Sequence, residues 1–129
     1  MVLKLSWTLD GDGGNKKISA WDDIEFRLDR IEGKDGTLTI DVINSNEIEA
    51  ECLQLRAEKG FYFMTLGGVK NGEYVVKTYR DLSQPDIEVM ILGDNWPAQN
   101  ITKNFDIVKL VFKEFFDTGN VETRLLKVR

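Results

Sequence analysis

Apolar and polar residues alternate near the start of the chain, where Leu3, Leu5, Trp7 and Leu9 fall on one side of an extended segment. Polar residues occupy the positions between them. A period of two is typical of a β-strand with one buried face. Residues 3–9 are therefore predicted to form such a strand.

Two later segments repeat apolar residues at the spacing of an amphipathic helix. The first covers residues 20–32, with Ser19 before it as a predicted N-cap and Gly33 at its end. The second covers residues 103–117, and Gly119 follows where a glycine commonly closes a helix. Its phenylalanines make this second helix the expected centre of the core.

Five strands are predicted between the helices, because short apolar or alternating runs are separated by turns such as Gly67-Gly68 and Asn71-Gly72. They cover residues 37–43, 49–58, 61–66, 74–79 and 87–92. Short connections between consecutive strands favour an antiparallel meander.

Together these elements predict an α+β fold: an antiparallel meander sheet of five to seven strands, with two main helices packed on one face. Residues 1–129 are expected to form a single domain, since the length is that of an ordinary domain and no linker or repeat interrupts it. Residues 10–15 and 93–97 are predicted loops. Residues 121–129 are expected to form a short edge strand or to pack loosely, and the second sheet face to be solvated in part or covered by a partner.

The residue types present exclude several kinds of chemistry. The chain has no histidine, so it has no Ser-His-Asp or Cys-His arrangement and no metal site that needs imidazole. The single cysteine, Cys52, forms no internal disulfide and is expected to be a small, half-buried residue. We expect no cofactor, and a protein that is not an enzyme.

Charge is distributed unevenly along the chain. The net charge is −5, and residues 10–51 hold twelve acids and only five bases. An acidic surface argues against nucleic-acid binding through phosphates. It favours a cationic protein partner, because a surface of one sign steers the encounter. The alternative is that the acids only keep the domain in solution.

A set of acids and one tryptophan are the candidate partner-binding residues. They are Asp10, Asp12, Asp22, Asp23 and Glu25, with Glu49, Glu51 and Trp96 as further candidates. The four aspartates are expected to cluster at one end of the sheet. Trp96 is expected either to fill a gap in the core or to be an exposed anchor, and the sequence leaves both readings open.

The location of the protein also bears on its partners. The chain shows no secretory leader and no apolar run near the ~20 residues that span a bilayer. We therefore expect a cytoplasmic protein without a membrane partner.

The string Glu-Phe-Phe-Asp-Thr-Gly at residues 114–119 is the most distinctive in the chain. With this E-F-F-x-T-G helix end, the chain resembles small immunity proteins of bacterial polymorphic and contact-dependent toxin systems, and related uncharacterised bacterial families. Trp7, Trp21 and residues 91–94 also match their pattern. The sequence departs from it after Gly119, where a proline-containing tail is absent.

The resemblance implies an immunity protein that neutralises a cognate toxin by covering its active or substrate-binding surface. It also implies that the partner is a basic toxin domain, often a nuclease, and that the acids imitate the phosphates that this toxin normally binds. Two alternatives stay open. One is a small structural or ligand-binding module that pairs with a second copy through an uncovered strand edge or sheet face. The other is a carboxylate-dependent enzyme, although a simple meander offers little depth for a two-carboxylate cleft.

Overall fold

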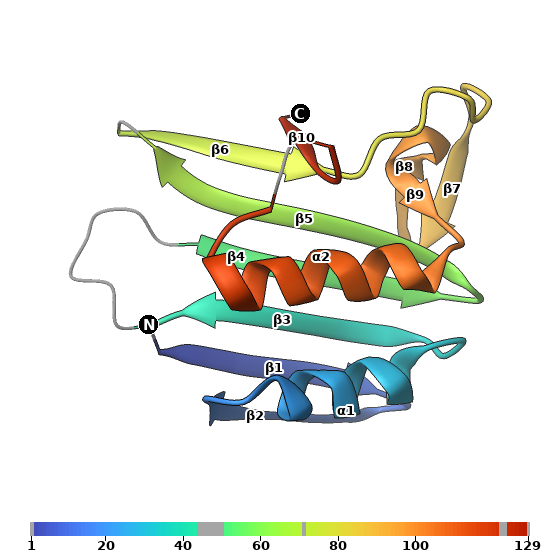
Figure 1. Ribbon diagram of the computed structural model, residues 1–129. Helices are drawn as coiled ribbons and strands as arrows, with labels where there is room; N and C mark the ends of the chain where they lie inside the picture. The colour runs from blue at the N-terminus through green and yellow to red at the C-terminus, as the bar shows by residue number, and fades with distance from the viewer. Residues whose placement is uncertain (1, 44–50, 71, 122–123, 129) are drawn as a thin grey trace.

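The computed structural model describes residues 2–43, 51–70, 72–121 and 124–128, and the structural statements below concern these residues. Figure 1 shows their arrangement. In chain order the elements are β1 (Leu3–Leu9), β2 (Asp12–Ile18), α1 (Trp21–Ile31), β3 (Gly36–Val42), β4 (Glu51–Glu58), β5 (Phe61–Lys70), β6 (Glu73–Thr78), β7 (Glu88–Ile91), β8 (Asp94–Pro97), the 3-10 turn η1 (Ala98–Asn100), β9 (Ile101–Thr102), α2 (Phe105–Thr118) and β10 (Lys127–Val128).

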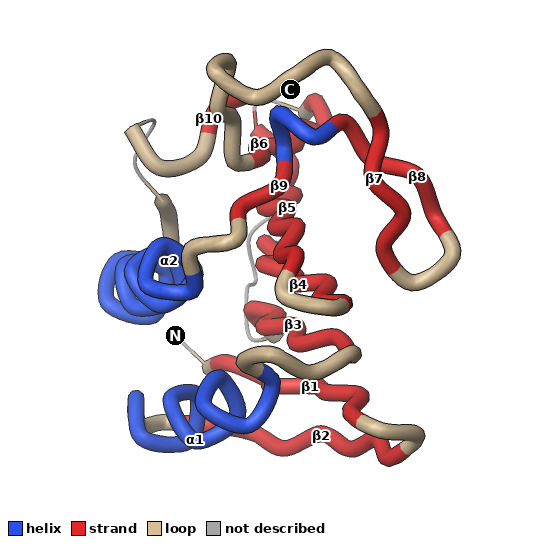
Figure 2. Tube along the Cα trace, turned by 90° about the vertical axis from the view of Figure 1, so that its right-hand side faces the viewer, coloured by secondary structure: helices blue, strands red, loops and turns tan. Residues whose placement is uncertain are grey.

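One large sheet organises the molecule. Its strand order is β10-β6-β5-β4-β3-β1-β2, and β9 pairs with β5 beside this path. All of these pairings are antiparallel. Both helices lie on one face of the sheet, which we call the helix face, and the β7–β8 hairpin lies on the other, the open face (Figure 2). The predicted α+β fold, with a meander sheet and two helices on one face, is confirmed.

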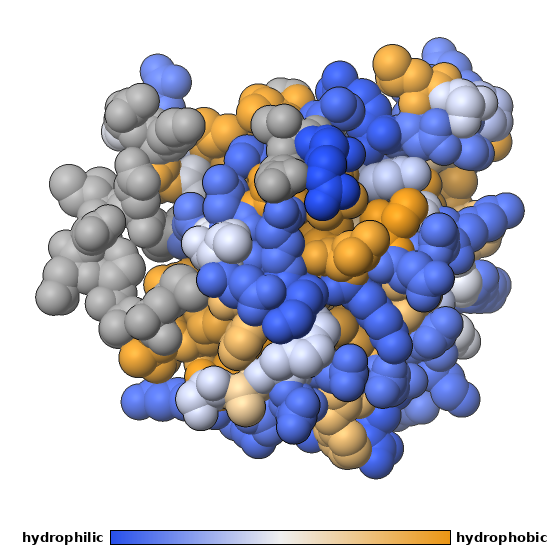
Figure 3. Space-filling view, in the orientation of Figure 1, coloured by the Kyte–Doolittle hydropathy of each residue, from blue (hydrophilic) through white to orange (hydrophobic). Residues whose placement is uncertain are grey.

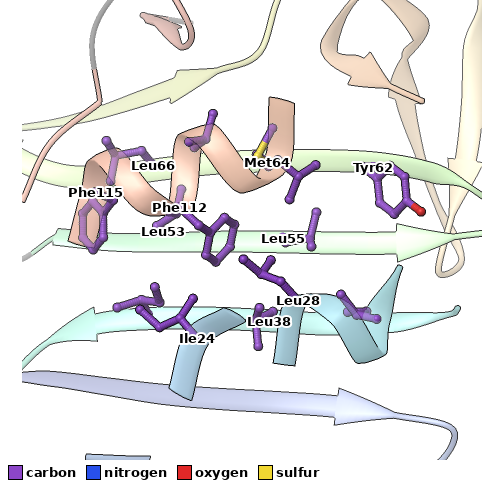
Figure 4. Packing of buried hydrophobic residues seen from close by; sticks show 14 of the residues in the cluster. Ile24, Leu28, Leu38, Leu53, Leu55, Tyr62, Met64, Leu66, Phe112 and Phe115 are labelled. Carbon is purple, nitrogen blue, oxygen red and sulfur yellow. The ribbon is translucent and has the colours of Figure 1, made fainter. Parts of the chain in front are cut away.

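The helix face buries the main core of the protein. Phe112 and Phe115 of α2 are fully buried, as are Ile24 and Leu28 of α1. They pack against strand residues such as Leu55 (Figure 4). As predicted, α2 supplies large aromatic side chains to this core, and Tyr62 of β5 adds another. Neither helix is long and apolar enough to cross a membrane, as far as the described residues go.

The two helices also contact one another directly. The rings of Trp21 and Phe116 lie with their centroids 5.9 Å apart. Lys109 of α2 donates to Asp29 of α1 at 2.8 Å. These contacts fix the position of α1 beside α2 at both of its ends.

The ends of the helices follow the predictions in part. Asn104 caps α2 by accepting a hydrogen bond from the Asp106 amide at 3.0 Å. Gly119 closes α2 in the left-handed conformation, with φ 77°, as expected. The predicted N-cap of α1 is wrong: Ala20 takes that position without a side-chain cap, because the helix begins one residue after the predicted start and leaves Ser19 outside it.

Residues 10–15 do not form the predicted loop. Asp10 and Gly11 both have positive φ, 51° and 83°, and make a tight turn that leads directly into β2. The polar strand β2 pairs with β1 over its whole length. Its lack of apolar alternation reflects its place at the edge of the sheet, where little of it is buried.

Residues 93–97 are also not a loop. A second tight turn, at Leu92 and Gly93 with φ of 51° and 89°, joins β7 to β8. The hairpin forms a separate two-stranded sheet, so the predicted strand over residues 87–92 exists but does not join the main sheet.

The glycine pair Gly67-Gly68 lies inside β5 rather than in the predicted turn. A β-carbon on Gly67 would meet the hydroxyl of Tyr74, so the ring of Tyr74 lies across the strand at this point. A glycine within a strand commonly marks such a close approach.

Candidate partner-binding surfaces

The predicted acidic cluster is divided between the two ends of β2. Asp10 and Asp12 flank the β1–β2 turn, whereas Asp22 and Asp23 lie in the first turn of α1, after the other end of the strand. Seven residues at about 3.3 Å each place the two groups roughly 20 Å apart. The expectation of a single cluster of four aspartates is therefore wrong, because residues 12–18 are extended.

Acidic side chains dominate the exposed sides of α1. They are Asp22, Asp23, Glu25, Asp29 and, at its C-cap, Glu32. Two of these acids form ion pairs with lysines of neighbouring elements. The ammonium of Lys16 in β2 lies 2.9 Å from the carboxylate of Asp23, and that of Lys109 in α2 lies 2.8 Å from the carboxylate of Asp29. We call this set the α1 acids.

The two arginines of α1 lie over aromatic rings. The guanidinium of Arg27 is 3.7 Å from the ring centre of Trp7, and that of Arg30 is 4.2 Å from the ring centre of Phe26. Cation–π contacts of this kind orient the guanidinium against the protein. Arg27 is half-buried and Arg30 is exposed, so the outer surface of α1 carries charges of both signs, with the acids in the majority.

The remaining acidic candidates contribute less to this surface. Glu51 begins β4, at the same end of the sheet as the start of α1, but β3 and β1 lie between β4 and β2. Glu49 lies outside the described residues. The structure brings together Asp22, Asp23 and Glu25 and leaves Asp10, Asp12 and Glu51 apart from them.

Trp96 is half-buried and packs inward, which agrees with the prediction of a core-filling side chain rather than that of an exposed anchor. Its indole stacks on Phe63, with ring centroids 4.2 Å apart. It packs against a second, smaller core made of Phe63, Ile91 and Ile101. Arg56 of β4 lies over the indole and forms a 3.2 Å ion pair with Asp94. Trp96 therefore holds the β7–β8 hairpin against the open face.

Residues 81–97, which we call the arm, carry a surface that the sequence did not reveal. Large apolar side chains are exposed on it, at 72% for Leu82, 57% for Ile87 and 59% for Met90. A contiguous exposed apolar patch marks an interaction site, whereas single exposed apolar side chains are common on protein surfaces. The alternation over residues 87–92 could have suggested one outward side, but it equally fits a strand of the main sheet.

A hollow of about 580 Å³ lies between the arm, β9 and the start of α2. Its walls are mainly apolar and include Phe61, Ile87, Val89, Ile101 and Ile107. Figure 3 shows apolar surface over the N-terminal half of α2 and toward β9, with hydrophilic surface around it. The volume falls within the about 300–1,000 Å³ of typical ligand pockets.

The hollow has one carboxylate and one ammonium group among its described lining residues. The Asp81 carboxylate accepts hydrogen bonds from the side chains of Ser83 and Gln84 and from the Ser83 amide, which hold the pKa of Asp81 below its usual value. Lys103 places its ammonium 5.0 Å from the ring centre of Phe61. The lining thus offers apolar contact and isolated charges rather than a pair of carboxylates.

The thiol of Cys52 lies on β4 at a half-buried position, as expected. Burial, a hydrogen bond to Asp41 and the charge of Asp41 raise the pKa of Cys52 to about 12. A thiol with this pKa is protonated at neutral pH and is a poor nucleophile. No group of three acidic or cysteine side chains that could hold a metal ion is present in the described ranges.

Comparison with known proteins places this fold in a family. Residues 5–125 match a family of unknown function, DUF6911. The chain belongs to this family. A crystal structure of a hypothetical protein from Neisseria gonorrhoeae has the same fold, with a TM-score of 0.72 and 23% sequence identity over 95% of this chain and 90% of that chain. No curated protein matches the chain. Neither the DUF6911 description nor that of the neisserial protein names an activity, so the resemblance to immunity proteins remains a prediction.

Proposed function

We propose that the protein is a non-enzymatic binding protein, an immunity protein that acts in the bacterial cytoplasm and neutralises a cognate basic toxin by covering its active or substrate-binding surface. The observation that supports this proposal is the excess of acids on the outer surface of α1. The acids come from one helix, and its two arginines lie over the rings of Trp7 and Phe26.

The packing of α1 suits this role. Ile24, Leu28 and Ile31 are buried and anchor the helix to the sheet. The backbone that carries the α1 acids is therefore ordered before a partner arrives, which lowers the entropic cost of binding. A basic surface that normally binds phosphates would meet a fixed row of carboxylates, and attraction between the two charged surfaces would speed association.

A capture experiment with a matched control tests the proposal. Tagged protein is incubated with lysate of its host at low and high salt, and bound proteins are identified by mass spectrometry. The expected result is a basic toxin domain that is lost at high salt and whose activity falls when the protein is added. Recovery of partners without toxic activity would contradict the proposal.

The role of α1 is tested separately. The double variant Asp22→Asn/Glu25→Gln should capture less toxin, because it removes two of the α1 acids. The variant Asp10→Asn/Asp12→Asn removes the same number of charges from the opposite end of β2 and should capture toxin as the parent does. Equal capture by both variants would mean that α1 does not supply the contact surface.

A further inference from the structure

The strand β2 forms one edge of the main sheet. It pairs with β1 over seven consecutive residues without a bulge, and none of the other described strands lies along its outer side. Natural sheets usually shorten, bend or cover such an edge, because its free backbone groups pair readily with another strand. The opposite edge strand, β10, has only two residues. The outer side of β2 is therefore the longer open edge of the described sheet.

The turn before β2 determines which backbone groups point outward. Both turn residues have positive φ, as in a type I′ turn, in which the Leu9 carbonyl accepts a hydrogen bond from the Asp12 amide. The hydrogen bond from the Ile43 amide to the Val2 carbonyl agrees with this phase, because it commits the alternate residues of β1 to the other side. The backbone groups of β2 that point away from the sheet thus belong to Gly13, Asn15 and Lys17.

The two ends of β2 differ in charge. Asp10 and Asp12 lie at its start, and Lys16 and Lys17 lie near its end. A second β2 in antiparallel orientation would set the acidic end of each strand beside the basic end of the other, whereas a parallel orientation would set like charges together. Opposite charges on facing residues stabilise a strand pair, and like charges destabilise it. The edge is therefore complementary to a second copy of itself related by a two-fold axis.

A glycine at the middle of β2 permits close approach of a second strand. A β-carbon on Gly14 would lie 2.5 Å from an atom of the Trp7 indole, so this ring covers the glycine on the helix face. If Gly14 lies opposite Gly14 of a second copy, no side chain of β2 separates the two strands at this point. The half-buried indoles of the two copies then approach one another beside the axis.

The side of α1 above β2 has a matching distribution of charge. Asp23, Arg27 and Arg30 follow one another at helical spacing. Asp23 pairs with Lys16 at 2.9 Å near the end of β2, and Arg27 covers Trp7. Arg30 lies beside the end of β1, next to the start of β2. In an antiparallel pair, the acidic start of each helix would face the basic end of the other.

The remaining acids of α1 lie on another side of the helix. Asp22, Glu25 and Asp29 recur at helical spacing, and Asp29 pairs with Lys109 of α2, not with β2. A second copy at the β2 edge would therefore leave these carboxylates exposed.

We infer that β2 pairs with β2 of a second copy in antiparallel orientation, with the two Gly14 residues opposite each other on the two-fold axis. In this register Gly13 and Asn15 exchange hydrogen bonds between the strands, and Asp12 of each copy faces Lys16 of the other. The main sheet then continues from one copy into the other, with the helices of both on the same face. The inference goes beyond the proposed function, because each copy keeps its own surface for a toxin.

The first measurement is the mass of the full-length chain in solution. Sedimentation equilibrium from about 1 µM to about 1 mM should show a dimer, alone or in equilibrium with the single chain. Hydrogen exchange then locates the contact, by comparison of the parent with the charge variants described below. The amides of Gly13 and Asn15 should be protected in the dimer and lose this protection in the variants, whereas those of Gly14 and Lys16, which point toward β1, should change less. The mass of a single chain throughout, or dimer protection confined to β10 or the arm, would overturn the inference.

Two charge reversals test the register. Asp12→Lys sets a lysine opposite Lys16 at two places in the dimer, and Lys16→Glu sets a glutamate opposite Asp12 at two places. Each variant alone should dimerise about tenfold more weakly than the parent. Mixed in equal amounts, the two variants should form a heterodimer about as tight as the parent dimer, because each facing pair again consists of one acid and one base.

Matched controls separate this contact from an effect of net charge. Asp86→Lys on the arm and Lys127→Glu on β10 make the same changes of charge at exposed positions away from β2, and both should dimerise as the parent does. Equal weakening by the controls would overturn the inference, as would a mixture of the β2 variants that is no tighter than either alone. The ion pair lost in Lys16→Glu lies at the surface, so this variant should keep its fold. Failure of these tests leaves the toxin capture by the α1 acids untouched, and failure of that capture leaves dimerisation untouched.

Discussion

The indole of Trp96 lies on the phenyl ring of Phe63, with 22° between the ring planes. This contact joins β8 of the arm to β5 of the main sheet. The Leu92 amide adds a 3.3 Å hydrogen bond to the Glu58 carboxylate near the tip of the hairpin. Attachment of the arm therefore depends on a few side chains, of which the stacked pair is the largest.

The variant Trp96→Ala is expected to loosen the arm. Loss of a half-buried aromatic contact should lower the free energy of unfolding by about 2–3 kcal/mol. Hydrogen exchange should become faster in β7 and β8 through local opening, while β1 and β3 should become faster only as far as global unfolding does. Met90→Ala is the control, since its exposed side chain should change stability by less than about 0.5 kcal/mol. Equal protection of the hairpin in both variants would show that the stack does not hold the arm.

Two glycines offer a test of close packing in the sheet. A β-carbon on Gly36 would collide with the backbone carbonyl oxygen of Thr8, which is fixed by the pairing of β1 and β3. A β-carbon on Gly67 would collide with the end of the Tyr74 side chain, which is 70% exposed and can move.

Gly36→Ala should therefore destabilise the protein by more than about 2 kcal/mol, and Gly67→Ala by less than about 1 kcal/mol. Urea unfolding of the two variants measures the difference. The reverse order of stability would contradict the register of β1 with β3.

The thiol of Cys52 should react slowly in the folded protein. Its pKa of about 12 leaves almost no thiolate at pH 8, so a disulfide reagent should modify the native chain far more slowly than the chain unfolded in denaturant. Asp41→Asn removes the hydrogen bond and the charge that help to raise the pKa. It should speed the reaction while burial keeps the pKa above 9.0, the ordinary value. Native and unfolded chains that react at the same rate would contradict this environment.

The same shift predicts a loss of stability at alkaline pH. Because the pKa of Cys52 is raised in the folded state, its contribution to stability is complete below about pH 9 and is lost as the pH rises toward 12. Cys52→Ser or Cys52→Ala should remove this part of the pH dependence. Chemical denaturation across pH 8–11 would measure it.

The turn at the start of the arm should open in acid. Hydrogen bonds from Ser83 and Gln84 lower the pKa of Asp81, so the stabilisation they give is present above the ordinary value of 3.8 and is lost as the pH falls through the lowered pKa. Ser83→Ala should raise the pKa of Asp81 toward 3.8, as followed by carbon-13 NMR of the carboxyl group. An unchanged titration would show that Ser83 does not donate to this carboxylate in solution.

The helices and the buried strands could be predicted because their buried residues recur at a regular spacing along the sequence. Ile24 and Leu28 recur at helical spacing, and Leu53 and Leu55 alternate with polar residues, since each pair faces one core. The edge strand β2 has solvent on most sides and so carries no such period. The Asp10-Gly11 turn is the feature of the sequence that points to this strand, but the glycines that follow it favour a loop over residues 10–15.

The candidate surfaces were harder to predict, because they depend on where strands end. Asp12 and Asp22 are near in sequence, but the extended strand β2 separates them in the structure. The sequence pattern does not predict the arm for a different reason. Alternation over residues 87–92 shows that one side is buried, but not which sheet buries it, and only the pairing of β7 with β8 leaves Ile87 and Met90 exposed.

The position of α2 late in the chain has a consequence for synthesis. β1 to β6 all precede α2, which carries Phe112 and Phe115. At about 5–20 residues per second on the ribosome, the apolar side of the growing sheet stays bare for several seconds, with Leu53 and Met64 uncovered. Emergence of residues 105–118 then covers this surface. A nascent chain halted before this helix should aggregate or be degraded rather than persist as a smaller folded protein.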